Sequence, residues 1–224
     1  MVEKRAGLVT QPGLGHDDDA LLNGIFALHG NRLQNLGKIR DFGLLHRLDR
    51  ETSGLLVVGL SAKAYDGLRA QFENRMVRKF YWAICSRAPA QQVGLINKPI
   101  AEMEPRGAGD KKLARIMPPP RGKQSETAYR VLASNVAAAL VECRPLSGRL
   151  HQVRVHMQAV GCDILGDGLY APARFANAAP RLALHAHRLA FTHPITGEVV
   201  DARTDFPNDL RPVLRRLKLP LPAQ

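Results

Sequence analysis

The chain has 224 residues and carries 32 Lys and Arg against 20 Asp and Glu, which gives a formal net charge of +12. This length suits one domain, and the 45% apolar content is typical of a globular protein rather than of a disordered basic tail. No apolar run approaches the roughly 20 residues of a membrane span. The first 13 residues contain no apolar segment of a secretory signal. Composition therefore predicts a soluble, cytoplasmic, globular protein without a membrane partner.

The positive charge indicates a polyanionic partner, because Lys and Arg that neutralise phosphates release counterions from nucleic acid. The basic residues recur in several segments of the chain, at 69–79, 111–123 and 211–218. Such segments could converge on one surface of a folded domain. Basic composition is also common in proteins without a nucleic-acid partner, so the charge alone leaves both interpretations open.

The first half of the chain contains signals for two helices and two strands. Residues 1–18 are rich in Gly and Asp and are expected to be irregular. Asp19 is a candidate N-cap for a helix that Gly30 would end. The short apolar run 54–60 predicts a buried strand. Ser61 can cap a second helix, whose apolar side chains recur at Tyr65, Leu68, Phe72 and Met76, and residues 79–85 predict a strand.

The second half adds mainly strands. Residues 101–124 form a basic segment rich in Pro and Gly, which we expect to be an exposed loop. Strands are predicted at 127–132, 138–143, 182–191 and 199–204, and a helix from Leu150 that ends at Gly161. Strands scattered among a few helices indicate an α+β fold with a largely antiparallel sheet. We expect residues 1–224 to form a single domain.

A polar turn between two hydrophobic runs, residues 46–54, is the densest group of chemically active side chains. Asp49 is a carboxylate that a rigid scaffold on both sides would hold facing a cleft. Arg47 and Arg50 lie within reach of Asp49 and would favour its ionised form. By spacing alone, the same residues could form a surface loop with ordinary charge pairs.

A second polar group lies in residues 147–167. If the chain is helical from Leu150, His151, Arg154 and Gln158 share one side of the helix, which suits an anion or a solvated surface. His151 and His156 are five residues apart, which is the wrong spacing for two metal ligands on one helical face. Motifs for dinucleotides, nucleoside triphosphates and serine hydrolases are absent. The sequence therefore predicts no metal and no cofactor.

Six segments in order along the chain resemble motifs of the RluA-type pseudouridine synthase family. HRLDRETSGLLVV at 46–58 resembles HRLDxxTSGLL, and KFYWA at 79–83 is similar to the KxYxA strand. The other four are SETAY at 125–129, SGRLHQVRVH at 147–156, GDGLY at 166–170, and LHAHRLAFTHP at 184–194. The resemblance implies the pseudouridine synthase catalytic fold, with a mixed, largely antiparallel sheet flanked by helices and loops around an RNA-binding cleft.

The resemblance also implies the chemistry and its residues. A uridine of structured RNA would be flipped out and isomerised to pseudouridine without a cofactor. Asp49 would act on the ribose, as a nucleophile or by removing a proton. Tyr81 would stack on the base, and Arg154 would pair with the carboxylate. The residues expected to bind substrate are Arg47, His46, Arg149, His151, Gln152 and Lys79.

The resemblance has several departures and leaves alternatives. Leu150 replaces the family's usual Thr, Asp163 replaces the usual Pro, and Arg5 replaces the Pro of the KPAG motif. Lys4 to Gly7 could be the remnant of the family's NKPAG motif, but only three residues precede it, so the strand before the motif is expected to be missing. A relative that binds RNA without catalysis is the main alternative, and a metal-dependent nuclease using Asp49 and the histidines is another. The expected substrate is a stem-loop of ribosomal or transfer RNA, and the expected state is a monomer.

Overall fold

The computed structural model describes residues 1–13, 15–104, 107 and 112–223. The chain divides into two compact units. Unit 1 comprises Met1–Lys79 and Ala186–Asp205, and unit 2 comprises Phe80–His185 and Phe206–Gln224. Two strands, β3 (Arg78–Cys85) and β9 (Leu184–Thr192), cross the boundary between the units. The single catalytic domain expected from the sequence stays a prediction.

Unit 1 contains short antiparallel strands. β1 (Val2–Lys4) pairs with β2 (Ser53–Leu56), and β10 (Val199–Arg203) pairs with β9. The expectation that the N-terminal strand is missing is therefore wrong, because even three residues suffice to pair with β2. Gly54 has φ +118°, and a Cβ at this position would lie 2.2 Å from the carbonyl oxygen of Ala186. Only glycine fits where the polar turn enters β2.

The first helix of unit 1 is longer than the sequence predicts. α1 (Leu21–Leu36) begins after Ala20 rather than after a side-chain cap, and it continues past Gly30. The backbone of His29 departs from helical values, at φ −136° and ψ 24°, so the chain bends at this point without ending the helix. A 3₁₀ segment, η1 (Lys38–Gly43), follows α1.

The second helix of unit 1 agrees closely with its sequence signals. α2 (Ala62–Glu73) is capped by the Ser61 hydroxyl, which accepts the Ala64 N–H at 3.3 Å. Leu68 on this helix packs in one hydrophobic cluster with residues of β2 and β9, including Leu55, Leu189 and Phe191. This cluster is the core that supports the polar turn preceding β2.

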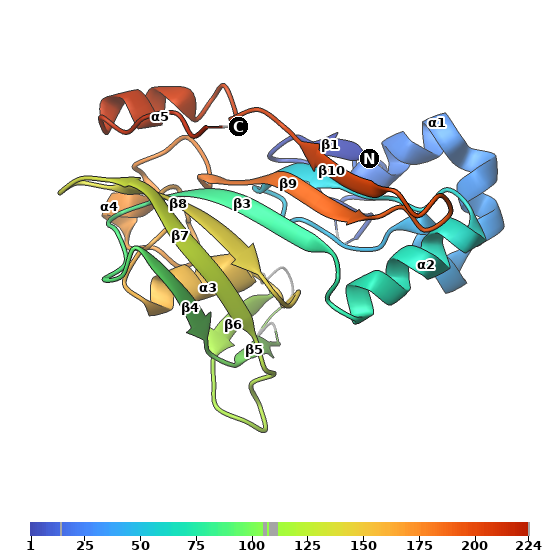
Figure 1. Ribbon diagram of the computed structural model, residues 1–224, viewed down its shortest axis with the longest axis horizontal. Helices are drawn as coiled ribbons and strands as arrows, with labels where there is room; N and C mark the ends of the chain where they lie inside the picture. Colours follow the sequence, from blue (N-terminus) through green and yellow to red (C-terminus); the bar gives the residue numbers. More distant parts are fainter. Residues whose placement is uncertain (14, 105–106, 108–111, 224) are drawn as a thin grey trace. The chain divides into compact units, whose positions relative to one another are not determined.

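Unit 2 is built on four antiparallel strands in the order β3, β8 (Ala139–Pro145), β7 (Glu126–Ser134) and β4 (Val93–Asn97). The helix α3 (Gln152–Ala159) contacts β7 and β8 (Figure 1). Gly161 follows the C-cap with φ +74°, as the sequence predicts. Two short helices, α4 (Ala173–Ala176) and α5 (Arg211–Arg216), complete the unit. The α+β fold with a largely antiparallel sheet is thus confirmed.

The core of unit 2 includes all three cysteines of the chain. Cys85, Cys143 and Cys162 are free thiols with no exposed surface, and they pack with residues such as Trp82 and Met157. Burial raises the pKa of all three thiols, that of Cys162 to about 11. These cysteines therefore behave as small apolar side chains of the core.

The sequence predicts that the basic segment 101–124 is a loop throughout, and the structure corrects this prediction. β5 (Ile100–Met103) and β6 (Leu113–Ile116) form an antiparallel hairpin. Ile100 and Ala114 are buried together with Val155 of α3 in a small cluster of their own. This burial holds the two strands together even though their sequence is flanked by Pro and Gly. Residues 105–106 and 108–111, which belong to the predicted loop, lie outside the described residues.

Candidate active site

The Asp49 turn of unit 1 is fixed at both of its ends. Leu48 is buried before it, and Thr52 and Ser53 are buried after it. The Thr52 N–H donates to the Asp49 carbonyl at 3.1 Å, which closes the turn. The Asp49 side chain is half-buried, whereas Arg47 is exposed. The turn therefore presents a carboxylate on a backbone that has little freedom to move.

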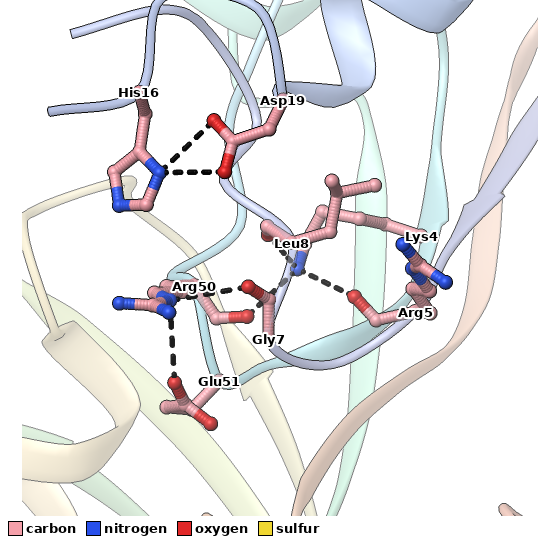
Figure 2. A network of polar contacts seen from close by, with 8 residues as sticks. All are labelled: Lys4, Arg5, Gly7, Leu8, His16, Asp19, Arg50 and Glu51. Carbon is pink, nitrogen blue, oxygen red and sulfur yellow. Dashed lines mark hydrogen bonds and ion pairs between the residues drawn. The ribbon is translucent and has the colours of Figure 1, made fainter.

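A buried lysine ties the N-terminal segment to this turn (Figure 2). Lys4 has no exposed surface, and its ammonium donates to the carbonyls of Arg5 at 3.0 Å, Leu8 at 2.7 Å and Arg50 at 3.0 Å. Arg50 also accepts the Gly7 N–H at 2.9 Å, and its own guanidinium donates to the Gly7 carbonyl at 3.1 Å. The residue that follows Asp49 is thus held by several hydrogen bonds.

Thr10 fixes the residue before Asp49 in the same way. Its buried hydroxyl donates to the Leu48 carbonyl at 2.8 Å and accepts the Leu48 N–H at 3.2 Å. Both neighbours of Asp49 in the chain are therefore bonded to residues 4–10. Sequence reasoning placed Lys4 in a possible motif remnant without a contact and gave Thr10 no role, because nothing in the local pattern shows which distant backbone groups a side chain will reach.

His46 and Lys79, both expected to bind substrate, lie in unit 1, and the Lys79 charge acts on His46. The His46 Nε2 accepts the Val57 N–H at 3.1 Å, and the ring packs 4.9 Å from that of Phe72. Burial, with a smaller effect of the Lys79 charge, lowers the pKa of His46 to about 3. Burial also lowers the pKa of Lys79 to about 8. His46 is thus a neutral side chain that carries its proton on Nδ1.

Tyr81 lies on β3 in unit 2, directly opposite Cys143 of β8. Its ring is half-buried and packs against the core of the unit. A strand in the middle of a paired sheet holds such a ring in one direction. Tyr81 therefore has the rigid, partly accessible aromatic surface that a stacked base requires.

Arg154 forms a buried ion pair with a residue that sequence reasoning quoted in a motif but gave no role. Its Nε and Nη2 donate to the two carboxylate oxygens of Asp167 at 2.8 Å and 2.6 Å. The side chain of Arg154 is 6% exposed and that of Asp167 is 2% exposed. A two-point contact of this kind fixes the plane of the guanidinium as well as its position.

Gln152 is buried, and its amide is used inside the protein. The carbonyl oxygen accepts from the Ser147 hydroxyl at 2.8 Å and from the Arg149 N–H at 3.0 Å. The amino group donates to the Glu126 carbonyl at 2.8 Å and to the Thr127 hydroxyl at 3.1 Å. These four bonds fill the capacity of an amide. Gln152 therefore shapes the turn that carries the half-buried Arg149.

The polar side of α3 predicted from the sequence faces one residue, Tyr170. The His151 Nδ1 lies 2.7 Å from the Tyr170 hydroxyl, and the Arg154 guanidinium lies 5.0 Å from the centre of the tyrosine ring. The Gln158 amide donates to the Tyr170 carbonyl. The helix begins at Gln152 rather than at Leu150, and His151 is its N-cap with φ +51°, but His151, Arg154 and Gln158 all face Tyr170.

The predicted site residues fall into two groups, one in each unit. Unit 1 carries His46, Arg47, Asp49 and Lys79, and unit 2 carries Tyr81, Arg149, His151, Gln152 and Arg154. Among the described residues, no group of three or more His, Cys, Asp or Glu side chains is arranged to hold a metal ion. Within the same residues, no helix has the length and apolar character needed to cross a bilayer.

The sequence of the chain is similar to a family model and to curated proteins, which define its class. The family model described as RNA pseudouridylate synthase matches residues 1–159. Ribosomal large subunit pseudouridine synthase D of Zymomonas mobilis is 36% identical over 226 residues, which cover 98% of this chain and 70% of that protein. The uncharacterized RNA pseudouridine synthase YlyB of Bacillus subtilis is 35% identical over 219 residues, which cover 97% of this chain and 69% of the relative.

A solved structure agrees with the sequence relatives. Human RNA pseudouridylate synthase domain containing 4 superposes with a TM-score of 0.71 at 26% identity, covering 99% of this chain and 90% of that one. The chain therefore belongs to the RNA pseudouridine synthase family. It is an isomerase that acts on RNA, which confirms the family, the fold and the enzyme class expected from the sequence motifs.

Proposed function

We propose that this enzyme isomerises a specific uridine of structured ribosomal RNA, with Asp49 acting on the ribose. In the reaction, the bond between uracil N1 and the anomeric carbon breaks and the base rotates. Uracil C5 then forms a carbon–carbon bond to the same sugar and loses its proton, while the freed nitrogen takes up a proton. The relatives named as ribosomal large subunit synthases support ribosomal RNA. A stem-loop of transfer RNA is the alternative substrate.

The observation that carries this proposal is the way in which the Asp49 backbone is held. The residues before and after Asp49 are bonded to Thr10 and Lys4, while the carboxylate itself stays half-buried. A group that attacks a sugar, or removes its proton, must be placed within a few tenths of an ångström, and a fixed backbone provides this accuracy. Asp49 acts either as a nucleophile on the sugar or as the base that removes its proton.

We propose the following roles for the other residues on the basis of the family resemblance. Tyr81 stacks on the flipped uracil, since aromatic side chains are the usual partners of unstacked bases. Arg154, kept in place by Asp167, supplies the cation that pairs with the catalytic carboxylate. The exposed Arg47 binds the phosphate backbone or fills the space that the flipped base leaves.

The remaining predicted residues contribute to RNA binding in this proposal. His46, Lys79, Arg149 and His151 contact the RNA, and Gln152 acts through Arg149 as a positioning residue, because its amide bonds are made within the protein. We further propose that the enzyme works as a cytoplasmic monomer. A sedimentation measurement that finds a stable dimer would contradict the monomer.

The test is Asp49→Asn, which keeps the size of the side chain and removes its charge and nucleophilicity. Pseudouridine formation on ribosomal RNA should fall to background, while RNA affinity and thermal unfolding stay close to those of the wild type. The matched control is Asp66→Asn on α2, an exposed carboxylate paired with Arg40, which should leave turnover unchanged. A folded Asp49→Asn protein with a tenth of the wild-type rate would remove Asp49 from the catalytic role.

A further inference from the structure

We infer that Tyr170 is a positioning residue that ties the β5–β6 hairpin to Arg154 and His151, so that the hairpin and the α3 side chains are held as one body. This inference rests on the proposed function, because it assigns Arg154 and His151 to the reaction with RNA. It adds a residue that the sequence motifs contain without a role.

The Tyr170 hydroxyl joins two elements that are far apart in the chain. It accepts the backbone N–H of Ala114, in β6, at 2.8 Å. It also lies 2.7 Å from Nδ1 of His151, at the start of α3. A phenol has one proton to donate. Besides the bond from Ala114, the hydroxyl makes one hydrogen bond with His151 Nδ1, and the imidazole tautomer decides which of the two groups donates.

The ring and backbone of Tyr170 hold the other end of the connection. The guanidinium of Arg154 lies 5.0 Å from the ring centre, within the range of a cation–π contact. The N–H groups of Leu169 and Tyr170 donate to Asp167 Oδ1 at 3.0 Å and 3.2 Å. The same carboxylate receives both bonds from Arg154. A shift of Tyr170 would therefore move both groups that orient Arg154.

The hairpin needs this connection because its contact with α3 is only partly close-packed. Ile100, Ala114 and Val155 form the buried cluster beneath it. Beside this cluster lies a groove of about 550 Å³ that is open to solvent, whose wall includes Lys98, Arg115 and Tyr170. Close packing fixes an element by filling its surroundings, and here it does so on one side only. The Ala114–Tyr170 hydrogen bond holds the strand next to the groove.

The described part of the hairpin carries exposed charges of both signs, with Glu102 and Glu104 on or beside β5. Lys112 and Arg115 are exposed on or beside β6, and Lys123, also exposed, follows the hairpin. Exposed cations of this kind attract the phosphates of RNA. A displacement of the hairpin by a bound RNA would move Ala114 and, through the hydrogen bond to its hydroxyl, Tyr170 and the residues around Arg154. Tyr170 thereby makes the placement of Arg154 depend on the hairpin.

The test is Tyr170→Phe, which keeps the ring beneath Arg154 and removes only the hydroxyl. We expect kcat on ribosomal RNA to fall roughly tenfold, because a buried N–H loses its acceptor and the placement of His151 is released. The dissociation constant for RNA should stay within about threefold. The matched control is Tyr65→Phe, which removes a hydroxyl bonded to Asp41 at 3.1 Å in unit 1 and should leave kcat unchanged.

Hydrogen exchange of the Ala114 amide gives a second readout in the wild-type protein, independent of whether the variant folds well. This amide should be protected in the wild type and lose protection in Tyr170→Phe. An unprotected Ala114 amide in the wild type, or a folded Tyr170→Phe protein with wild-type kcat, would overturn the inference. Equal losses in kcat and RNA affinity would do so as well. A wild-type enzyme without turnover on ribosomal RNA would instead refute the proposed function.

Discussion

Replacing Lys4 by Met tests how strongly the N-terminal segment supports the catalytic turn. The variant keeps an unbranched side chain of similar length and removes an ammonium that donates to three carbonyls. The Arg50 carbonyl still has the Gly7 N–H, so the carbonyls of Arg5 and Leu8 are the ones that lose their donor. An unsatisfied buried acceptor costs about 1–3 kcal/mol.

The net effect is smaller than the sum of these costs, because the variant no longer has to bury a charge. We expect the free energy of unfolding to fall by about 2–3 kcal/mol, which lowers the melting temperature of a chain this long by roughly 4–12 °C. Turnover should also fall by about tenfold or more below the melting temperature, since small displacements of a reacting group are costly. Thermal unfolding and single-turnover assays measure the two effects.

Lys63→Met is the matched control for this experiment. Lys63 is exposed on α2, and a surface substitution of this kind changes stability by about 0.5 kcal/mol or less. If Lys4→Met melts within 2 °C of the wild type and turns over at a similar rate, the buried ammonium does not support the turn, and the reasoning above is wrong.

Three further outcomes are expected. The pKa of His46 is about 3 in the folded protein, below its ordinary value near 6.5, so between these values the unfolded chain takes up a proton that the folded protein does not. Stability is therefore lost as the pH falls below about 6.5. His46→Gln should reduce the drop in melting temperature between pH 7 and pH 5, and equal drops in the variant and the wild type would contradict the assignment. Lys79 has a pKa of about 8 and loses its charge as the pH rises through this value. A binding titration should therefore show that RNA affinity weakens between pH 7 and pH 9 in the wild type, and that it weakens less in Lys79→Arg. Tyr81→Ala should slow turnover by roughly 10- to 100-fold through lost stacking, whereas Tyr81→Phe should remain close to the wild type; a large loss in Tyr81→Phe would give the hydroxyl a chemical role.

Capping residues and apolar spacing in the sequence predicted a helix correctly where the packing of the folded protein favours the same helix. α2 follows from the Ser61 cap and from Tyr65 and Leu68, which are buried as their spacing requires. α1 shows the opposite case. Gly30 is a strong stop signal, and the helical backbone is indeed interrupted beside it at His29, but a second helical stretch follows in which Leu33 and Leu36 are buried at 0% and 4% exposure. Tertiary burial outweighs the cost of one glycine in a helix, which is about 1 kcal/mol.

The candidate site likewise contains residues that the sequence could predict and residues that it could not. The sequence pointed to Asp49, Tyr81 and Arg154 through motifs that lie within short segments. The residues that hold these segments in place could not be found locally: Lys4 reaches a carbonyl 46 positions away, and Tyr170 reaches an N–H 56 positions away. A contact between distant segments is fixed by the folded path of the chain, and a single sequence does not contain that path.

The three buried cysteines make site-specific labelling of this enzyme straightforward. Thiol reagents attack the thiolate of an accessible cysteine, and here every native thiol is enclosed in the core of unit 2 with a raised pKa. A single cysteine introduced at an exposed position, such as Lys63 on α2, would carry a fluorophore or spin label while the native cysteines remain in place. The motion of the labelled segment on RNA binding could then be followed in the otherwise unmodified protein.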